Sequence, residues 1–99
     1  MQYTKIEVIV SGAVERSGRA RLEPGATVAT ALRAAGGLAF RDDAVPAGDL
    51  LLRRRLPTSR TTSVYRWSIF ESSQTSWRSF ELQPRDVLVF GWSVRGDSA

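Results

Sequence analysis

The sequence predicts a small α+β domain, in which a mixed sheet of four to five strands packs on one short helix. Three features predict it: apolar residues that alternate over 6–10, apolar residues spaced by three and four over 28–35, and a continuous apolar run over 87–92. A chain of 99 residues, 42% of them hydrophobic, can build one modest core. We therefore expect a single domain over 1–99, with its core at about 3–92 and a flexible tail at 93–99.

The N-terminal segment predicts a β-hairpin. The alternation over 6–10 indicates a strand at about 3–11 with one face on the core. Gly12 can form a bulge or adopt a positive φ where the chain leaves this strand. The Ser17-Gly18 turn then favours a short antiparallel return strand over 19–22.

A tight turn and a short helix follow the hairpin. Pro24 and Gly25 suit the central positions of a type II turn, because proline fixes φ and glycine permits a positive φ. Thr27 can cap a helix over 28–35, whose apolar stripe faces the sheet. The Gly36-Gly37 pair ends this helix through a left-handed residue.

The middle of the chain predicts a loop and two strands. Residues 39–49 are expected to form a crossover loop, which Phe40 and Val45 pin to the core. A third strand covers 50–55 and a fourth covers 64–70. Leu56-Pro57 and the polar run 58–63 separate them, and the fourth strand places on one face Tyr65, Trp67 and Ile69.

The C-terminal third predicts a central strand. A polar loop over 72–76 and a brief extended piece over 77–82 lead into a turn at 83–86. The run 87–92 is apolar on both faces, which is typical of a strand that is buried on both sides. We expect its parallel neighbour to be the N-terminal strand.

The residue types narrow the classes of function. The chain has no cysteine, which excludes disulfides, thiolate zinc sites and cysteine nucleophiles. It also has no histidine, which removes the commonest general base and the usual transition-metal ligand. We therefore expect no enzyme activity, no catalytic residues, no metal and no cofactor.

Positive charge is concentrated in one segment. The net charge is +4, yet residues 51–80 carry six arginines against one acid, whereas the rest of the chain carries eight cations and nine acids. An anionic partner would be drawn to this segment. Thirteen of the 14 cations are arginine, which suits phosphate and carboxylate recognition, although a GC-rich genome produces the same bias.

Seven residues of the basic segment are candidate ligand-binding residues: Arg53, Arg54, Arg55, Arg66, Trp67, Trp77 and Arg78. The arginine run must place side chains on both sheet faces. It either grips an acidic sugar, a phosphate or a partner's carboxylates, or forms a solvated strand end that discourages edge-to-edge aggregation. The interleaved cations and rings suit stacking on sugars or bases, unless both tryptophans belong to the core.

Other candidates have simpler interpretations. Trp92 either packs in the core or forms a subunit contact, because aromatic residues are enriched in interface cores. Four acidic residues lack a calcium-loop pattern and a third carboxylate nearby, so we expect them to be solvated. They are Glu15, Glu23, Asp42 and Asp43. The tripeptide over 95–97 spells a cell-adhesion motif, which we attribute to chance in the tail.

The combined sequence of the turn and helix segments resembles one known family. The segments that carry the resemblance are Val10-Ser-Gly-Ala-Val14, Leu22-Glu-Pro-Gly25, Thr27-Val28, Ala31-Leu32, Ala34-Ala-Gly-Gly-Leu38 and Leu82-Gln-Pro-Arg-Asp-Val-Leu-Val89. They look like the soluble-ligand-binding β-grasp (SLBB) domain over residues 6–90. The resemblance implies a β-grasp, the ubiquitin-like architecture. Its matching turn residues are structural: Gly12, Pro24, Gly25, Gly36, Gly37, Pro84 and Asp86. Family members usually have Pro-Gly-Asp before the last strand, so Arg85 questions the geometry of that turn.

The same resemblance implies a non-catalytic module of bacterial polysaccharide export or capsule assembly, which binds a soluble ligand or self-associates. Its expected partners are an anionic or neutral polysaccharide, a partner protein or further copies of the chain. We expect no membrane span in the chain, because no apolar run approaches the length that a membrane helix needs. Two alternatives stay open: a nucleic-acid-binding module similar to DNA-uptake competence proteins, and a ubiquitin-like adaptor that contacts proteins. We expect a periplasmic location if the chain is a domain of an export protein, and a cytoplasmic one if Met1 is the natural start.

Overall fold

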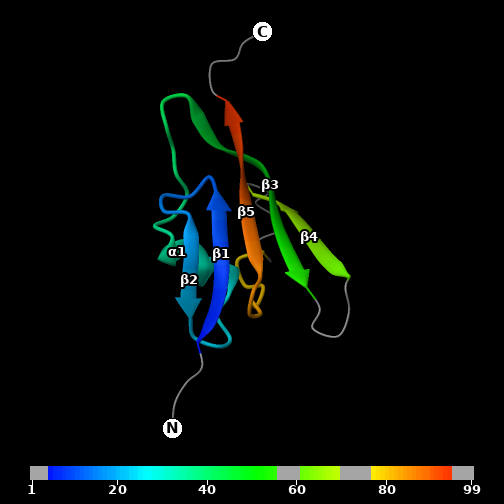
Figure 1. Ribbon diagram of the computed structural model, residues 1–99. Coiled ribbons are helices and arrows are strands. Elements are labelled where there is room, and N and C mark those ends of the chain that lie inside the picture. The colour runs from blue at the N-terminus through cyan, green and yellow to red at the C-terminus, as the bar shows by residue number, and fades with distance from the viewer. Residues whose placement is uncertain (1–4, 56–60, 70–76, 95–99) are drawn as a thin grey trace.

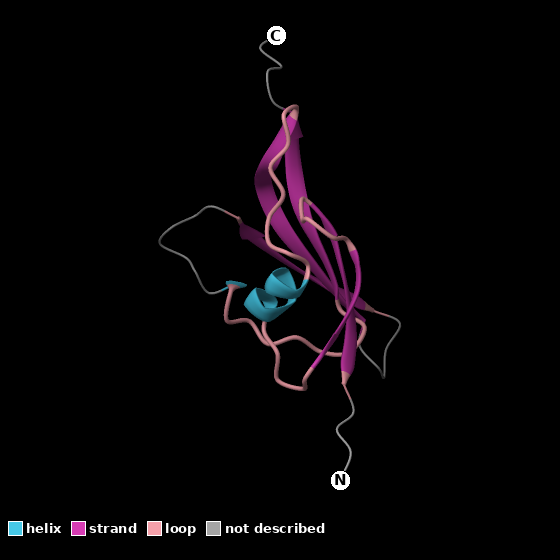
Figure 2. Cartoon of the chain, turned by 90° about the vertical axis from the view of Figure 1, so that its left-hand side faces the viewer, coloured by secondary structure: helices cyan, strands magenta, loops and turns pink. Residues whose placement is uncertain are grey.

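The computed structural model describes residues 5–55, 61–69 and 77–94. They form a five-stranded mixed sheet in the order β2-β1-β5-β3-β4, with one short helix on one of its faces (Figures 1 and 2). The elements are β1 (Ile6–Gly12), β2 (Gly18–Leu22), α1 (Val28–Ala34), β3 (Ala44–Arg55), β4 (Thr62–Ser68) and β5 (Val87–Val94). The predicted α+β class, with one short helix on a mixed sheet, is confirmed.

The last strand is central, as predicted. β5 pairs in parallel with β1, where Ile9 lies opposite Val87, and antiparallel with β3. We expected both faces of this strand to be buried, but only the face that points toward the helix is. Leu88 and Phe90 are fully buried under α1, whereas Val87 and Val89 are half-buried, because no helix covers their face among the described residues (Figure 2).

Helix α1 begins and ends where the sequence predicts, to within one residue. The Thr27 hydroxyl oxygen accepts a hydrogen bond from the Thr30 backbone N–H at 3.5 Å, which caps the helix. Gly36 and Gly37 follow it with φ of 87° and 89°, a conformation that glycine adopts without a steric penalty. The short helix thus gains its stability from the apolar face that it buries.

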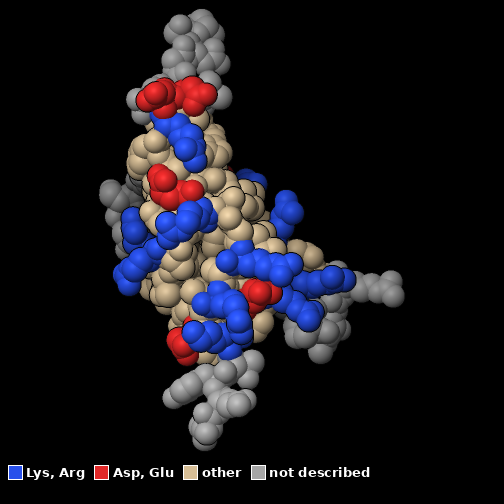
Figure 3. Space-filling view, turned by 60° about the vertical axis from the view of Figure 1, so that its left-hand side comes forward, with Lys and Arg blue, Asp and Glu red and all other residues tan. Residues whose placement is uncertain are grey.

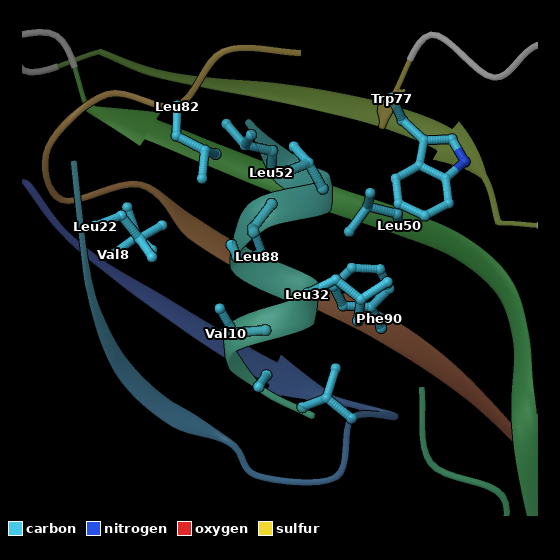
Figure 4. Packing of buried hydrophobic residues seen from close by; sticks show 14 of the residues in the cluster. Val8, Val10, Leu22, Leu32, Leu50, Leu52, Trp77, Leu82, Leu88 and Phe90 are labelled. Atoms are coloured by element: carbon cyan, nitrogen blue, oxygen red, sulfur yellow. The ribbon is translucent and has the colours of Figure 1, made fainter. Parts of the chain in front are cut away.

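The core lies between α1 and the sheet (Figure 4). The helix contributes Val28, Ala31 and Leu32, and the sheet contributes alternate residues of its three middle strands. Trp77 and Leu82, from the segment between β4 and β5, close the remaining side. The fully buried sheet residues that face the helix are Val8, Val10, Leu50, Leu52, Leu88 and Phe90.

The predicted crossover loop is wrong for residues 44–49, which belong to β3. This part of β3 pairs with the end of β5, and the register shifts between Pro46 and Leu50. An irregularity of this kind accommodates a proline, which has no N–H to donate, and a glycine, here Gly48 with φ of 79°. Phe40 does not pin the segment to the core, because 63% of it is exposed.

The turn before β5 keeps a left-handed residue although that residue is an arginine. Arg85 has φ of 71°, a region that ordinarily favours glycine. Its backbone N–H donates to the Glu7 carbonyl at 2.8 Å, and the Asp86 carboxylate accepts from the Gln83 N–H at 2.8 Å. The first bond holds the turn against β1, and the second closes the turn itself.

Several expectations lie outside the described residues. They concern the first residues of the N-terminal strand, the Leu56-Pro57 break, the end of the fourth strand at residue 70, the polar loop 72–76 and residues 95–99 of the tail with its tripeptide. The predicted start of the tail at residue 93 is wrong, because residues 93 and 94 belong to β5. Within the described ranges, no helix has the length and apolar character needed to cross a membrane.

Candidate binding surface

The three consecutive arginines lie on opposite faces of β3. Leu50 and Leu52 point into the core, and side chains alternate along a strand, so Arg54 shares their face. Arg53 and Arg55 lie on the other side, which we call the open sheet face, the face opposite α1. Both are exposed there, whereas Arg54 is half-buried.

Arg54 has a structural role. Its guanidinium donates to both carboxylate oxygens of Asp86, from Nε to Oδ1 at 3.1 Å and from Nη2 to Oδ2 at 2.9 Å. A third bond, to the Glu81 carbonyl at 3.0 Å, fixes the segment that precedes the turn. The guanidinium also lies over the rings of Tyr65 and Phe80, with centroids at 5.5 and 5.2 Å.

This pairing stabilises the charged form of Arg54. The hydrogen bond to Asp86 raises the pKa of the Arg54 guanidinium above its ordinary value, although burial acts in the opposite direction. The Asp86 side chain is fully buried, and its carboxylate accepts hydrogen bonds from the Arg54 guanidinium and the Gln83 N–H. Arg54 is therefore committed to a carboxylate of its own chain, which corrects its prediction as part of an anion grip.

The tryptophans of the basic segment belong to the helix side. Trp77 is 1% exposed and packs edge-on against Phe90, so the core alternative describes it. Trp67 is half-buried, stacked on Tyr65 and in edge contact with Phe80. A fully buried indole has no free face for a sugar or a base, which corrects the prediction for Trp77.

Among the described residues, the predicted pairing of cations with these two tryptophans occurs at one place. The Arg78 guanidinium lies 4.6 Å from the centroid of the Trp77 ring, and Arg78 itself is exposed. Arg66 lies on the opposite sheet face from its neighbour Trp67, because side chains alternate along β4. The structure therefore does not gather the seven predicted residues into one site.

Five arginines do come together on the open sheet face, and we call them the arginine rim. They come from β2, β3 and β4: Arg19, Arg21, Arg53, Arg55 and Arg66. The register places Arg19 beside Ile9, Ile9 beside Val87 and Val87 beside Arg53, in one row across four strands. Basic side chains gather on the lower half of the molecule in Figure 3, around few acidic ones.

The arginine rim is only partly neutralised. Asp49 pairs with Arg66 at 3.5 Å, and both side chains are largely exposed. Glu7 lies opposite Arg21 in the β1–β2 register. The other four rim arginines form no ion pair among the described residues. Five guanidinium groups against two carboxylates leave an excess of positive charge on this face.

An apolar stripe crosses the same face between the rim residues. Ile9 is 42% exposed and Val64 is 56% exposed. Between them lie three half-buried aliphatic residues of β3 and β5, so the stripe consists of Ile9, Val87, Val89, Leu51 and Val64. Sequence reasoning missed Arg19, Arg21 and the stripe. The alternation Arg19-Ala-Arg-Leu22 was the available signal, because it places both arginines on one face of a strand.

An exposed tryptophan lies at the far end of the β3–β5 pair. Trp92 is 38% exposed, and the Arg41 guanidinium lies 5.8 Å from its ring centroid. Phe40 is more exposed still. The four acids that were expected to be solvated are exposed: Glu15, Glu23, Asp42 and Asp43. In the described ranges, no three acidic residues come close enough to hold a metal ion.

One hollow lies beside the turn between β1 and β2. Its volume is about 230 Å³, and residues of that turn and of the end of α1 line it. The Arg16 guanidinium donates to the Ala34 carbonyl there at 3.3 Å. Pockets for small molecules are usually larger, on the order of 300–1,000 Å³. The open sheet face is therefore the more extensive candidate surface.

Comparison with known protein families gives no match for this chain, and comparison with curated proteins gives none either.

Proposed function

We propose that the chain is a non-catalytic binding module of the β-grasp type that takes an anionic partner on its open sheet face. The single observation that carries this proposal is the arginine rim, in which β2 and the distant pair β3–β4 bring five exposed arginines onto one surface. Solvent-exposed guanidinium groups bind carboxylates, sulfates or phosphates, because their fork geometry matches these anions.

The order of the strands supports the β-grasp part of the proposal. A hairpin, a helix and three further strands place the first and last strands side by side and in parallel. The resemblance of the turns to SLBB domains points in the same direction. We propose on this basis that the module serves polysaccharide export or capsule assembly, in an extracytoplasmic compartment.

The composition supports a function without catalysis. The chain contains neither histidine nor cysteine, so the commonest general base and the most nucleophilic side chain are both lacking. The buried carboxylate, Asp86, is occupied by Arg54 and by a backbone N–H. Its contacts stabilise a turn, and its side chain is fully buried.

Binding to an acidic polysaccharide tests the proposal. Polygalacturonate, neutral dextran and single-stranded DNA are titrated at low and at high salt against the wild type and Arg53→Ala/Arg55→Ala. We expect polygalacturonate to bind at low salt and to weaken with salt, because each contact releases a counterion. Removal of two exposed charge contacts should weaken binding by about tenfold.

The matched control is Arg33→Ala/Arg78→Ala, which removes the same charge from exposed residues on the helix side. It should leave affinity within about twofold of the wild type, because a surface charge acts weakly beyond about 10 Å at ordinary salt. Equal losses in the two variants would show that net charge, and not this face, determines binding. Absence of polyanion binding by the wild type at low salt would refute the proposal, and tighter binding of DNA would favour the nucleic-acid alternative.

A further inference from the structure

We propose that the partner of the open sheet face is an acidic polypeptide segment that also carries apolar side chains. This inference rests on the proposed function, because it names the partner class of the same surface. Three features of that surface carry it: the arrangement of apolar and basic residues, the placement of the aromatic rings, and the charge balance.

The first feature is the position of the apolar stripe. Ile9 and Val64 each expose about half of their surface, although isoleucine and valine are among the residues most often buried. They belong to a stripe whose middle lies on β5 and β3, but Val64 lies on the edge strand β4 directly opposite Arg53, so rim arginines lie beside the stripe and also within it. An apolar surface bordered by polar residues is the usual anatomy of a protein–protein interface, and arginine is enriched there.

The second feature is the absence of rings from this face among the described residues. Tyr65 and Trp67 lie on the helix side with Phe80, and Trp77 and Phe90 are buried. Recognition of single-stranded nucleic acid uses aromatic side chains on which the bases stack. Aliphatic side chains offer no such platform, and they gain most when apolar side chains of a partner cover them.

The third feature is the charge balance around the stripe. Four rim arginines form no ion pair within the described chain, and they lie on both sides of the stripe. Neighbouring strands are about 4.8 Å apart, so Arg19 and Arg53, three strands apart in one register row, are separated by roughly 14 Å. An extended acidic segment can reach both sides of the stripe, and its apolar residues can lie between them.

Two peptides of equal length and equal charge test the inference. In one peptide glutamate alternates with leucine, and in the other glutamate alternates with serine. Fluorescence anisotropy of labelled peptides measures both affinities, and polygalacturonate serves as an unlabelled competitor. We expect the glutamate–leucine peptide to bind about tenfold more tightly, because it covers two half-exposed aliphatic residues that the other peptide leaves in water.

Variants then locate the difference on the molecule. Ile9→Thr/Val64→Thr keeps β-branched side chains on both strands and removes apolar surface from the stripe. It should remove most of the tenfold preference for the leucine peptide and leave the serine peptide unchanged. Phe40→Ser is the matched control, because Phe40 is an exposed apolar residue outside the sheet. It should change neither affinity.

The outcomes separate this inference from the proposed function. Equal affinity of the wild type for the two peptides overturns the inference, and so does tighter binding of polygalacturonate than of the leucine peptide. In both cases, loss of binding in Arg53→Ala/Arg55→Ala would still support an anion-binding face. If the wild type binds none of the polyanions, the proposed function fails and the inference fails with it. The comparison of the two peptides uses the wild-type protein, so it tests the inference even if a variant does not fold.

Discussion

Replacement of Arg54 by leucine should strongly destabilise the domain. The Asp86 carboxylate is 0% exposed, and two of the three hydrogen bonds that it accepts within the described part of the chain come from Arg54, whose side chain is 16% exposed. In Arg54→Leu the carboxylate stays buried and keeps only the hydrogen bond from the Gln83 N–H among the described residues. The change therefore removes the countercharge without removing the charge.

The expected size follows from the burial of this pair. Removal of one partner of a buried ion pair costs about 3–5 kcal/mol, and the partial exposure of Arg54 places the loss near the lower limit, at about 3 kcal/mol. A domain of 99 residues has a total stability of roughly 5–15 kcal/mol. The melting temperature should fall by more than about 10 °C.

Urea unfolding measures the loss. The tryptophan fluorescence reports on folding, because Trp77 is buried at 1% exposure. The matched control is Arg53→Leu, which removes the neighbouring arginine of the same strand from the open sheet face. It should cost less than about 0.5 kcal/mol, as exposed substitutions usually do.

A double variant tests the physical reason. In Arg54→Leu/Asp86→Asn the amide oxygen can still accept from the Gln83 N–H, while the unpaired charge is gone. Its loss of stability should be smaller than the sum of the two single losses by at least about 1 kcal/mol. Equal stability of Arg54→Leu and Arg53→Leu would refute the reasoning, and so would simple additivity in the cycle.

The ion pair also has an expected pH dependence. A cation whose folded-state pKa is raised contributes stability that is fully present below its unfolded-state pKa and is lost only as the pH rises through the folded value. The pKa of Arg54 is raised by its hydrogen bond to Asp86. Between neutral pH and about pH 10, the stability difference between the wild type and Arg54→Leu should therefore stay constant.

Two further predictions concern the backbone. Gly12 and Gly25 have φ of 88° and 89°, but a Cβ on Gly12 would collide with the Phe90 carbonyl, whereas a Cβ on Gly25 meets no atom within 4 Å. Gly12→Ala should cost more than about 3 kcal/mol and Gly25→Ala about 1 kcal/mol in urea unfolding, and equal costs would contradict the structure. Arg85→Gly should be more stable than Arg85→Val by at least about 1 kcal/mol in thermal unfolding, because φ at this position is positive; the reverse order would contradict the left-handed turn.

The local features of the fold were predictable from the sequence. The alternation over 6–10, the spacing within α1 and the apolar run of β5 each depend on residues close together in the chain. These patterns predicted the hairpin, the helix to within one residue and the central place of the last strand. The extension of β3 through Pro46 and Gly48 was not predictable, because backbone pairing with the end of β5 outweighs the local preference of these residues for a loop.

The surface was less predictable than the fold. The sequence by itself determined that arginine is abundant, that three arginines fall on a strand, and that alternation separates their faces. Only the tertiary structure decided that Arg54 meets a carboxylate 32 residues away and that its neighbours share a face with Arg19 and Arg21. The physical reason is that β5, the last strand, inserts between β1 and β3 and sets both registers. Which charges are paired, and which remain free for a partner, therefore depends on contacts between distant segments.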